Sequence, residues 1–234
     1  MTHFDVFNGD ADGLCALHQL RLAFPRESTL ITGTKREIAL LQRICARTDD
    51  SVTVLDLCAD ANRLSLEALL NSGVRVEYID HHACSPLPVH PMLTARLDSD
   101  PQVCTAMLVD RVLEGRYRAW AIVGAYGDNL CLSARRLARS MRMTDYQRRA
   151  LRRLGIELNY NAYGESTDDL IIHPAELYRI LHPYPDPFAF IRAEHLPVLI
   201  ADRMKHDLSR AAKVQPIRCC DGGTITLLPD AAWR

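Results

Sequence analysis

The sequence predicts an α/β protein in which helices cover both faces of a parallel sheet. Over about the first 130 residues, apolar runs of strand length alternate with longer segments of helical character, and turn residues separate them. This alternation is typical of parallel sheets, because each return to the same edge needs a crossover that is usually a helix. There is no internal repeat or low-complexity tract. The 234 residues, 48% of them hydrophobic, suffice for one good core and a second, smaller unit.

The first strand is expected at residues 4–7. A Gly-containing turn and a helix over 13–23 follow, and the helix ends before Pro25 because proline cannot continue it. A second strand is predicted at 30–33 and a second helix at 36–45.

The next elements repeat this order. A third strand is predicted at residues 52–55, a helix at 62–70 and a fourth strand at 74–79. A helix at 103–113 follows, and then an apolar segment at 119–126, whose end we count among the strand ends.

The rest of the chain has a different character. Residues 133–158 are helical and rich in arginine, and a loop rich in Tyr and Asn follows at 159–164. A Pro-rich stretch at 183–187 precedes a helix at 195–213, and residues 224–228 resemble a strand.

We therefore expect a catalytic domain over residues 1–132, a helical linker or extension over 133–215, and the first strand of an incomplete C-terminal domain over 216–234. A single strand cannot fold alone, so the C-terminal strand pairs either with the main body or with a domain of which most is missing. We expect truncation of that domain.

Composition excludes several classes of protein. The net charge of −1 gives the whole chain no bias toward nucleic acid or an anionic membrane, so any such preference is local. No apolar stretch reaches the roughly 20 residues of a membrane span, and the N-terminus lacks the pattern of a secretory signal. The eight cysteines are scattered without C-x-x-C pairs, which favours buried thiols in the cytoplasm.

Acidic residues gather where the predicted strands end. In an open parallel sheet the binding crevice lies beyond the carboxyl ends of the strands, so these side chains are expected to meet. They are Asp10, Asp12, Asp56, Asp80 and Asp128, joined by His81 and His82. So many like charges repel one another unless a cation holds them. Carboxylate and imidazole ligands suit Mn²⁺ or Mg²⁺, and a site this acidic has room for two ions.

Each motif also has a purely structural interpretation. The segment Asn8–Gly13 suits a turn and a helix N-cap, Asp56 suits a helix cap, and Asp128 suits a turn. The run Asp80-His81-His82 is harder to explain structurally, because three adjacent ionisable groups after an apolar strand have no packing use. Taken together and in this order, the motifs favour a metal site.

At these residues the chain resembles the DHH phosphoesterase superfamily, in particular the RecJ and oligoribonuclease type of DHH domain. Motif one is Asp10-Ala-Asp12-Gly13, motif two ends at Asp56, motif three is Asp80-His81-His82, and motif four is Gly124-Ala-Tyr-Gly-Asp128. Together they span residues 4 to about 130, and the ordered set is highly specific. The resemblance implies a parallel-sheet α/β domain joined by a helical linker to a smaller substrate-binding domain.

The resemblance also implies a role for each residue. Asp56 would bridge two metal ions, Asp10 would help to hold the first, and Asp12, His81 and Asp128 would hold the second. His82 would contact the scissile phosphate or assist proton transfer, while a metal-bound hydroxide would act as nucleophile. Asp80 is a weaker metal candidate.

The sequence departs from the family pattern in two places. The family usually has a His four residues before the first Asp of motif one, where this chain has Val6, and the RecJ-like pattern has an Asp where this chain has Asn8. Asn8 offers only a weaker carbonyl ligand, so one of the two metal sites is expected to bind less tightly. The Gly-rich phosphate clamp of the family's C-terminal domain is also missing, which predicts poor turnover.

Basic residues are candidates for substrate contacts. Lys35 and Arg36 follow the second strand at the same rim and would meet a substrate phosphate. Eight arginines between 135 and 153 suit either a surface that follows the phosphates of short oligonucleotides or a solvated linker helix.

The main functional prediction is hydrolysis of phosphodiester or phosphomonoester bonds in a small nucleotide or short oligonucleotide. The alternatives are a nucleotide- or metal-binding module with impaired catalysis, and a pyrophosphate or polyphosphate hydrolase, which Val6 disfavours. A homodimer is expected because dimers are common in the relatives.

Overall fold

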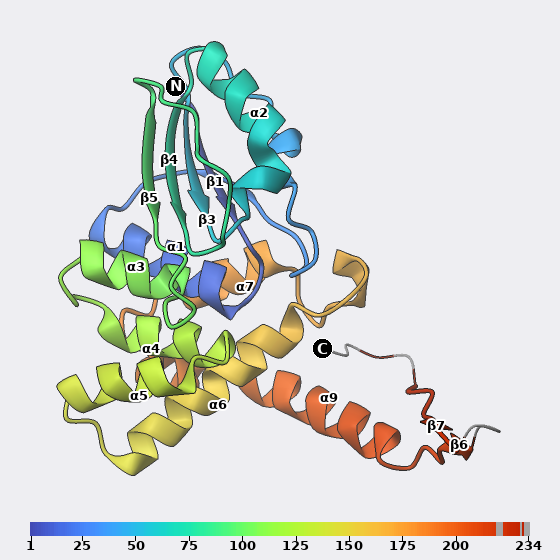
Figure 1. Ribbon diagram of the computed structural model, residues 1–234. Coiled ribbons are helices and arrows are strands. Elements are labelled where there is room, and N and C mark those ends of the chain that lie inside the picture. The colour runs from blue at the N-terminus through green and yellow to red at the C-terminus, as the bar shows by residue number, and fades with distance from the viewer. Residues whose placement is uncertain (219–221, 230, 232–234) are drawn as a thin grey trace.

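Five parallel strands form the central sheet, in the order β2-β1-β3-β4-β5 (Figure 1). The computed structural model describes residues 1–218, 222–229 and 231. The strands are β1 (His3–Phe7), β2 (Thr29–Ile31), β3 (Ser51–Leu55), β4 (Arg75–Asp80) and β5 (Leu93–Leu97). The parallel α/β fold predicted from the alternating pattern is confirmed.

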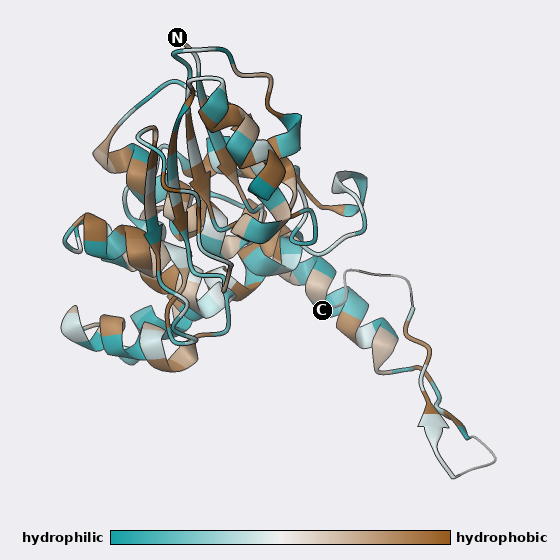
Figure 2. Ribbon diagram, turned by 45° about the horizontal axis from the view of Figure 1, so that its top comes forward, coloured by the Kyte–Doolittle hydropathy of each residue, from teal (hydrophilic) through white to brown (hydrophobic). Residues whose placement is uncertain are grey.

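Helices cover both faces of the sheet, as predicted. Val6, Val54 and Tyr78 pack in a core with α2 (Ala59–Asn71) and the 3₁₀ turn η1 (Leu40–Arg43). The opposite face packs in a larger core with the helices α1 (Ala11–Ala23), α3 (Thr105–Val112) and α4 (Arg118–Gly127). Hydrophobic residues run along the strands between these layers (Figure 2). The three central strands, β1, β3 and β4, therefore bury most of the side chains on both of their faces, as expected for a parallel sheet.

Further helices stand below the carboxyl ends of the strands in Figure 1. They are α5 (Cys131–Ser140), α6 (Asp145–Asn161), α7 (Pro174–Leu181), α8 (Pro187–Ala193) and α9 (Leu196–Ala211), with a 3₁₀ turn η2 (Thr167–Asp169) between α6 and α7. A capping box of Thr144 and Gln147 starts α6. Leu151, Leu154 and Leu158 of this helix lie in the same core as α1 and α4.

The helix predicted at residues 36–45 is wrong for most of its length. Only η1 is helical there, because backbone groups of this segment bind a side chain elsewhere. Asn62 accepts a hydrogen bond from the Leu41 amide (3.1 Å) and donates one to the Ile38 carbonyl (2.7 Å). Those long-range bonds replace the local bonds of a helix.

The apolar segment at 119–126 is the helix α4, so its end is not a strand end. This helix is buried from Trp120 to Gly127, which explains why its sequence lacks the polar stripe of a surface helix. Asp128 is therefore its C-cap residue. Sequence reasoning also missed β5 at the edge of the sheet, and both α7 and α8 around the Pro-rich stretch.

The predicted helix at 195–213 corresponds to α9, and a small hairpin lies beyond it, away from the sheet (Figures 1 and 2). The hairpin pairs β6 (Ile217–Arg218) with β7 (Thr224–Ile225) in antiparallel fashion. The predicted strand at 224–228 is thus short and has a partner. Cys219, Cys220 and Asp221 lie outside the described residues, and the six described cysteines are free thiols. No helix in the described ranges is long and apolar enough to cross a membrane.

Candidate metal centre

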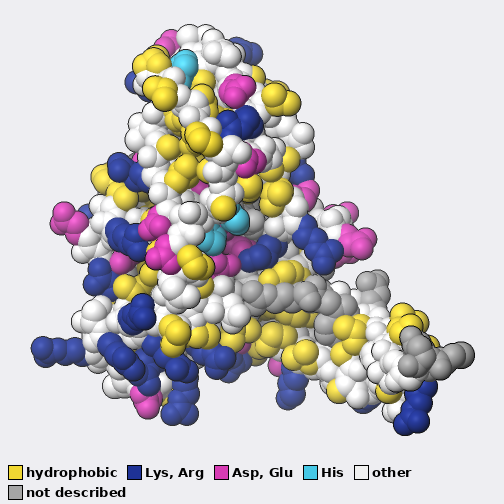
Figure 3. All heavy atoms as spheres, viewed as in Figure 1, with side chains coloured by type: hydrophobic (Ala, Val, Ile, Leu, Met, Phe, Trp, Pro, Cys, Tyr) yellow, Lys and Arg dark blue, Asp and Glu magenta, His cyan; other side chains and the backbone are white. Residues whose placement is uncertain are grey.

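The predicted acidic side chains meet at the carboxyl ends of β1, β3 and β4, where α4 supplies one more. Figure 3 shows histidines and acidic side chains gathered on this face, below the sheet. Asp10 and Asp12 follow β1, Asp56 follows β3, and His81 follows β4. The prediction that separate chain segments converge here is correct, although one of them is a helix end.

The loop after β1 holds its carboxylate through backbone amides. Asp10 caps α1, and its Oδ1 accepts hydrogen bonds from the amides of Asp12 (2.9 Å) and Gly13 (3.1 Å). The side-chain oxygen of Asn8 in turn accepts from the Asp10 amide (3.2 Å). A Cβ at position 13 would lie 2.2 Å from the Asn8 carbonyl oxygen, so this turn requires glycine. The capping interpretation of this motif therefore holds alongside the metal interpretation.

Asp12 joins the cluster to a second helix. Its Oδ2 accepts from the Thr105 amide (2.7 Å) and its Oδ1 from the Ala106 amide (2.8 Å), at the first turn of α3. Burial, together with the charges of Asp56 and Asp128, raises the pKa of Asp12 well above its usual value. A fully buried carboxylate in this position needs a positive neighbour to stay ionised.

Asp56 stands in the middle of the centre with a strained backbone. Its φ of 59° lies in the left-handed region that residues other than Gly, Asn and Asp seldom adopt. The amide donates to the Ile79 carbonyl of β4 (3.1 Å), and Oδ1 accepts from the Thr105 hydroxyl (3.1 Å). Burial alone would raise the pKa of Asp56, but its interactions with His81 outweigh burial and lower it.

His81 faces three carboxylates through one nitrogen. Its Nε2 lies 3.4 Å from Oδ1 of Asp56, 3.7 Å from Oδ2 of Asp128 and 3.9 Å from Oδ2 of Asp12. Burial lowers the pKa of this imidazole, but the three acidic groups raise it to about 10 in the absence of a metal ion. The same nitrogen is the atom that a cation shared by these carboxylates would bind.

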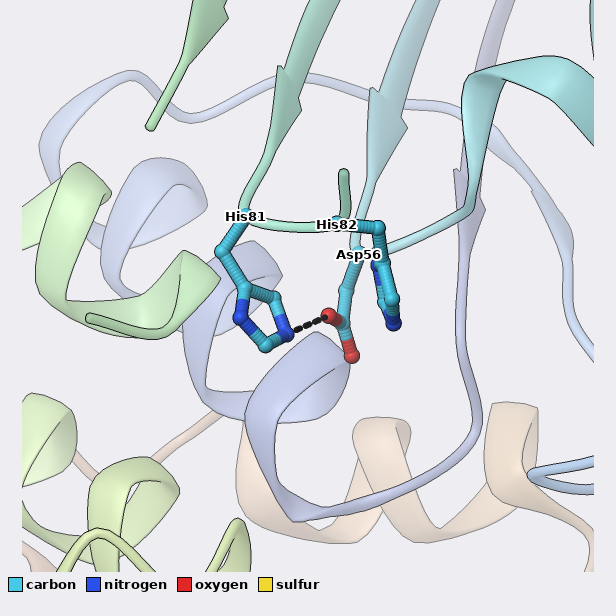
Figure 4. A group of neighbouring side chains, drawn as sticks. All are labelled: Asp56, His81 and His82. Carbon is cyan, nitrogen blue, oxygen red and sulfur yellow. Dashed lines mark ion pairs between the residues drawn. The ribbon is translucent and has the colours of Figure 1, made fainter. Parts of the chain in front are cut away.

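In the described part of the chain, two groups of three side chains could each hold a metal ion. Within each group the three ligand atoms lie within 4.8 Å of one another. One is Asp12, His81 and Asp128, and the other is Asp56, His81 and His82. Figure 4 shows that the two histidines enter from the loop after β4, on either side of Asp56. Asp10 and the weaker candidate Asp80 do not belong to these groups of acidic and histidine side chains, and the side-chain oxygen of Asn8 accepts the Asp10 amide instead.

His82 is oriented by its neighbour. Its Nδ1 lies 2.7 Å from Oδ1 of Asp80, which is fully buried, whereas the His82 side chain keeps 39% of its surface exposed. The bond to Asp80 raises the pKa of His82. Asp80 therefore fixes the ring of a histidine that solvent can reach.

Lys35 contacts the acidic cluster. Its ammonium group contacts Oδ2 of Asp10 and lies 3.4 Å from Oδ1 of Asp128 and 3.5 Å from Oδ1 of Asn159. Arg36, its predicted companion, is exposed, and its side chain makes no hydrogen bond or ion pair within the described residues. Sequence reasoning did not single out Thr105 or Asn159, since a helix N-terminus and an Asn in a connecting segment are common without any function.

No protein-family model matches the chain, and no curated protein matches it by sequence. Solved structures do. A DHH-domain protein described as a member of a family of ribosomal proteins aligns over 96% of this chain and 62% of its own, with a TM-score of 0.59 and 13% identity.

The exonuclease RecJ bound to manganese aligns over 91% of this chain and 64% of its own, with a TM-score of 0.57 and 17% identity. The fold of this chain is that of a DHH domain. The chain spans less than two thirds of the length of either protein, and the similarity confirms the resemblance drawn from the motifs at the level of fold.

The donor set of this centre fits a divalent cation. Carboxylate oxygens and an imidazole nitrogen, without thiolates, suit Mn²⁺, Mg²⁺ or a similar ion. Asp12, His81 and Asp128 would hold it, and Asp56 lies beside them. Burial, and after it the charges of Asp56 and Asp128, raise the pKa of Asp12, so a cation at this position would favour its ionised form.

Proposed function

We propose that this protein is a metal-dependent phosphoesterase that hydrolyses phosphodiester or phosphomonoester bonds of small nucleotides or short oligonucleotides, with Mn²⁺ or Mg²⁺ as cofactor. One observation carries the proposal. Asp12, His81 and Asp128 come from three separate segments and bring their ligand atoms within 4.8 Å of one another, in a domain with the DHH fold.

Each side chain of the centre has a part to play. When bound, the divalent cation supplies Lewis-acid activation of water and neutralises charge that develops on the phosphoryl oxygens. Asp56 accepts a hydrogen bond from the Thr105 hydroxyl and lies beside His81, so its carboxylate would contact the bound metal ion. His82 reaches solvent while Asp80 holds its ring, which suits a group that contacts the phosphate or transfers a proton.

A cavity beside the centre supports a nucleotide over pyrophosphate. It has a volume of about 340 Å³ and lies between α4, α6 and α9. Gly127 and Asn129, the neighbours of Asp128, form part of its wall. Tyr126, Tyr160 and Tyr163 supply aromatic surface on which a base could stack. Pyrophosphate has no group for such a surface to bind.

The alternative, a binding module with impaired catalysis, keeps its support from Val6 and Asn8 at motif one. A panel of a dinucleotide, a 3′,5′-bisphosphate nucleotide, a cyclic dinucleotide and pyrophosphate separates the candidates. The phosphoesterase hydrolyses one or more of the nucleotides when Mn²⁺ is added. Binding of metal and nucleotide without any turnover supports the binding module, and turnover of pyrophosphate alone supports the pyrophosphatase.

The free thiols of the described cysteines fit a cytoplasmic protein.

Asp56→Asn is the decisive variant, with Asp49→Asn as its control. Both positions have a positive φ, 59° and 72°, so the two substitutions make the same chemical change in the same backbone conformation. Asp49 is exposed and precedes β3, at the opposite end of the strand from Asp56. We expect Asp56→Asn to abolish turnover while the domain stays folded, and Asp49→Asn to leave turnover unchanged. Activity that survives in Asp56→Asn contradicts a role for this carboxylate at the metal.

A further inference from the structure

The position of Lys35 bears on how many metal ions the centre can hold. Its backbone amide donates to the Ala162 carbonyl (2.9 Å), which ties the segment after β2 to the end of α6. Its side chain is only 24% exposed and ends between Asp10, Asp128 and Asn159. The ammonium group is thus held within the acidic cluster, with little exposure to solvent.

Both oxygens of Asp10 are in use. Oδ1 accepts the amides of Asp12 and Gly13, and Oδ2 contacts the ammonium of Lys35. A cation bound by Asp10 would have to displace Lys35. Displacement would leave a buried ammonium group next to a divalent ion, which like charges disfavour.

Val6 and Asn8, the other motif-one positions, do not supply a free ligand for a first metal ion either. Val6 takes the place where the resembled family has a histidine, and its side chain is fully buried in the core under α2. The side-chain oxygen of Asn8 accepts the Asp10 amide. No replacement ligand for a first metal ion is therefore available from motif one.

Asp128 divides its two oxygens between two partners. Oδ1 lies 3.4 Å from the Lys35 ammonium, and Oδ2 lies 3.7 Å from Nε2 of His81. The first oxygen thus faces the lysine, and the second faces the group that can bind a metal ion. This arrangement places one organic cation and one metal position side by side.

We propose that the Lys35 ammonium group permanently fills the first cation position, so that this DHH domain binds one divalent ion, held by Asp12, His81 and Asp128. The inference rests on the proposed function. In this arrangement Lys35 also supplies the positive charge that a second ion would otherwise direct at the substrate phosphate.

Stoichiometry and electron paramagnetic resonance of the unmodified protein test the proposal first. After saturation with Mn²⁺ and removal of free metal, we expect one manganese per chain and the six-line spectrum of an isolated ion. Two ions per chain with an exchange-coupled spectrum would overturn the proposal and leave the phosphoesterase function intact. A chain that binds no manganese at all would overturn the proposed function itself.

Lys35→Met provides the second test, because it keeps the length of the side chain and removes its charge. We expect this variant to bind two Mn²⁺ ions per chain by calorimetric titration, where the unmodified protein binds one. Lys205→Met, an exposed lysine on α9, is the matched control and should still bind one ion. Lys35→Arg retains the charge and should also bind one. Unchanged binding of a single ion in Lys35→Met contradicts the role given to Lys35.

Discussion

At the scale of single residues, the centre separates groups that can bind metal from groups that orient them. Asp80 is a weak metal candidate by sequence, and in the structure its Oδ1 contacts Nδ1 of His82 from a fully buried position. A carboxylate that fixes a histidine ring acts on its tautomer and direction rather than on the cation.

Asp80→Asn tests that role. We expect kcat to fall about 10- to 100-fold while the affinity for Mn²⁺ stays within about twofold, because only the orientation of His82 is disturbed. Steady-state kinetics and metal titration measure the two quantities. Asp60→Asn is the control, since Asp60 pairs with Arg63 at the surface. Loss of metal affinity with an unchanged kcat would instead make Asp80 a ligand.

A second residue pair governs stability rather than chemistry. Asp5 is fully buried and accepts hydrogen bonds from Arg21 at Nε (2.8 Å) and Nη2 (2.5 Å). Burial alone would raise the pKa of Asp5, but the bonds from Arg21 and His3 outweigh it and lower the pKa from 3.8 to about 2. A depressed pKa means that the folded state favours the ionised form. The contribution to stability is therefore complete above pH 3.8 and lost as the pH falls toward 2.

Linkage puts this contribution at about 2 kcal/mol, and urea unfolding between pH 2 and 7 measures it. We expect Asp5→Asn to lower the unfolding free energy at pH 7 by about 3–5 kcal/mol, because buried Arg21 loses its carboxylate partner. Below pH 4 the unfolding free energy of this variant should depend less on pH. Ser28→Ala, which removes one hydrogen bond to Asp5 (2.6 Å), is the milder variant and should raise the midpoint of the acid transition. Glu165→Gln, at an exposed position, serves as control. An unchanged acid limb in Asp5→Asn would contradict the linkage.

At the residue scale the sequence predicted the main cluster well. Asp10, Asp12, Asp56 and His81 all lie where their places after strands predicted, since the ends of parallel strands share one edge. The contact of Lys35 with Asp128 was not predictable, because it depends on how the segment after β2 docks on α6. Sequence order gives no information about that docking.

At the scale of elements, α4 decides where Asp128 lies. Gly124 and Gly127 let α4 approach its neighbours closely. A Cβ at position 127 would meet the Ala11 Cβ at 2.3 Å and the Gly155 carbonyl oxygen at 2.9 Å. Gly127 is also the residue before Asp128, so any shift of the helix end moves a candidate ligand.

Gly127→Ala is therefore expected to lower the unfolding free energy by about 1–3 kcal/mol and to weaken Mn²⁺ binding. The added methyl group forces α1 and α6 away from α4. Thermal unfolding and metal titration give the two results. Ala61→Ser, on the exposed side of α2, is the control. Full metal affinity in Gly127→Ala would mean that the position of α4 does not determine the metal centre.

The elements that sequence reasoning misassigned share a physical cause. The apolar residues of α4 show no helical stripe because the helix is buried on all sides, so periodicity could not distinguish it from a strand. The segment 36–45 lost its helix to the long-range hydrogen bonds of Asn62. β5 was missed because it lies at the sheet edge, where most of its residues are exposed and the apolar signal of a buried strand is absent.

At the scale of the whole molecule, the charges are separated although they nearly cancel. The net charge is −1, yet arginines gather on the lower part of the molecule over α5 and α6 (Figure 3), while acidic groups line the centre. Within the described residues, several of these arginines are exposed and make no ion pair: Arg135, Arg136, Arg139, Arg142 and Arg149. Sequence reasoning could not choose between a solvated linker surface and a phosphate-binding one. The ion pairs of Arg148 with Asp145 and Arg153 with Glu157 show that only part of the charge is compensated locally.

If the exposed arginines bind the backbone of an oligonucleotide, their contribution depends on salt. Each phosphate contact to a single strand releases counterions and adds about 0.7 to the slope of log affinity against log salt. Replacing Arg135 and Arg139 together by Gln should therefore lower that slope by about 1.4 for a short single-stranded oligonucleotide, measured by fluorescence anisotropy. Hydrolysis of a dinucleotide should stay unchanged, because we expect it to be too short to reach from the metal centre to the arginines of α5. The control replaces the exposed Arg47 and Arg75, far from α5, in the same way. An equal slope in both double variants would show that the arginine surface only solvates the helices, and would restrict the substrate to nucleotides that fit at the metal centre.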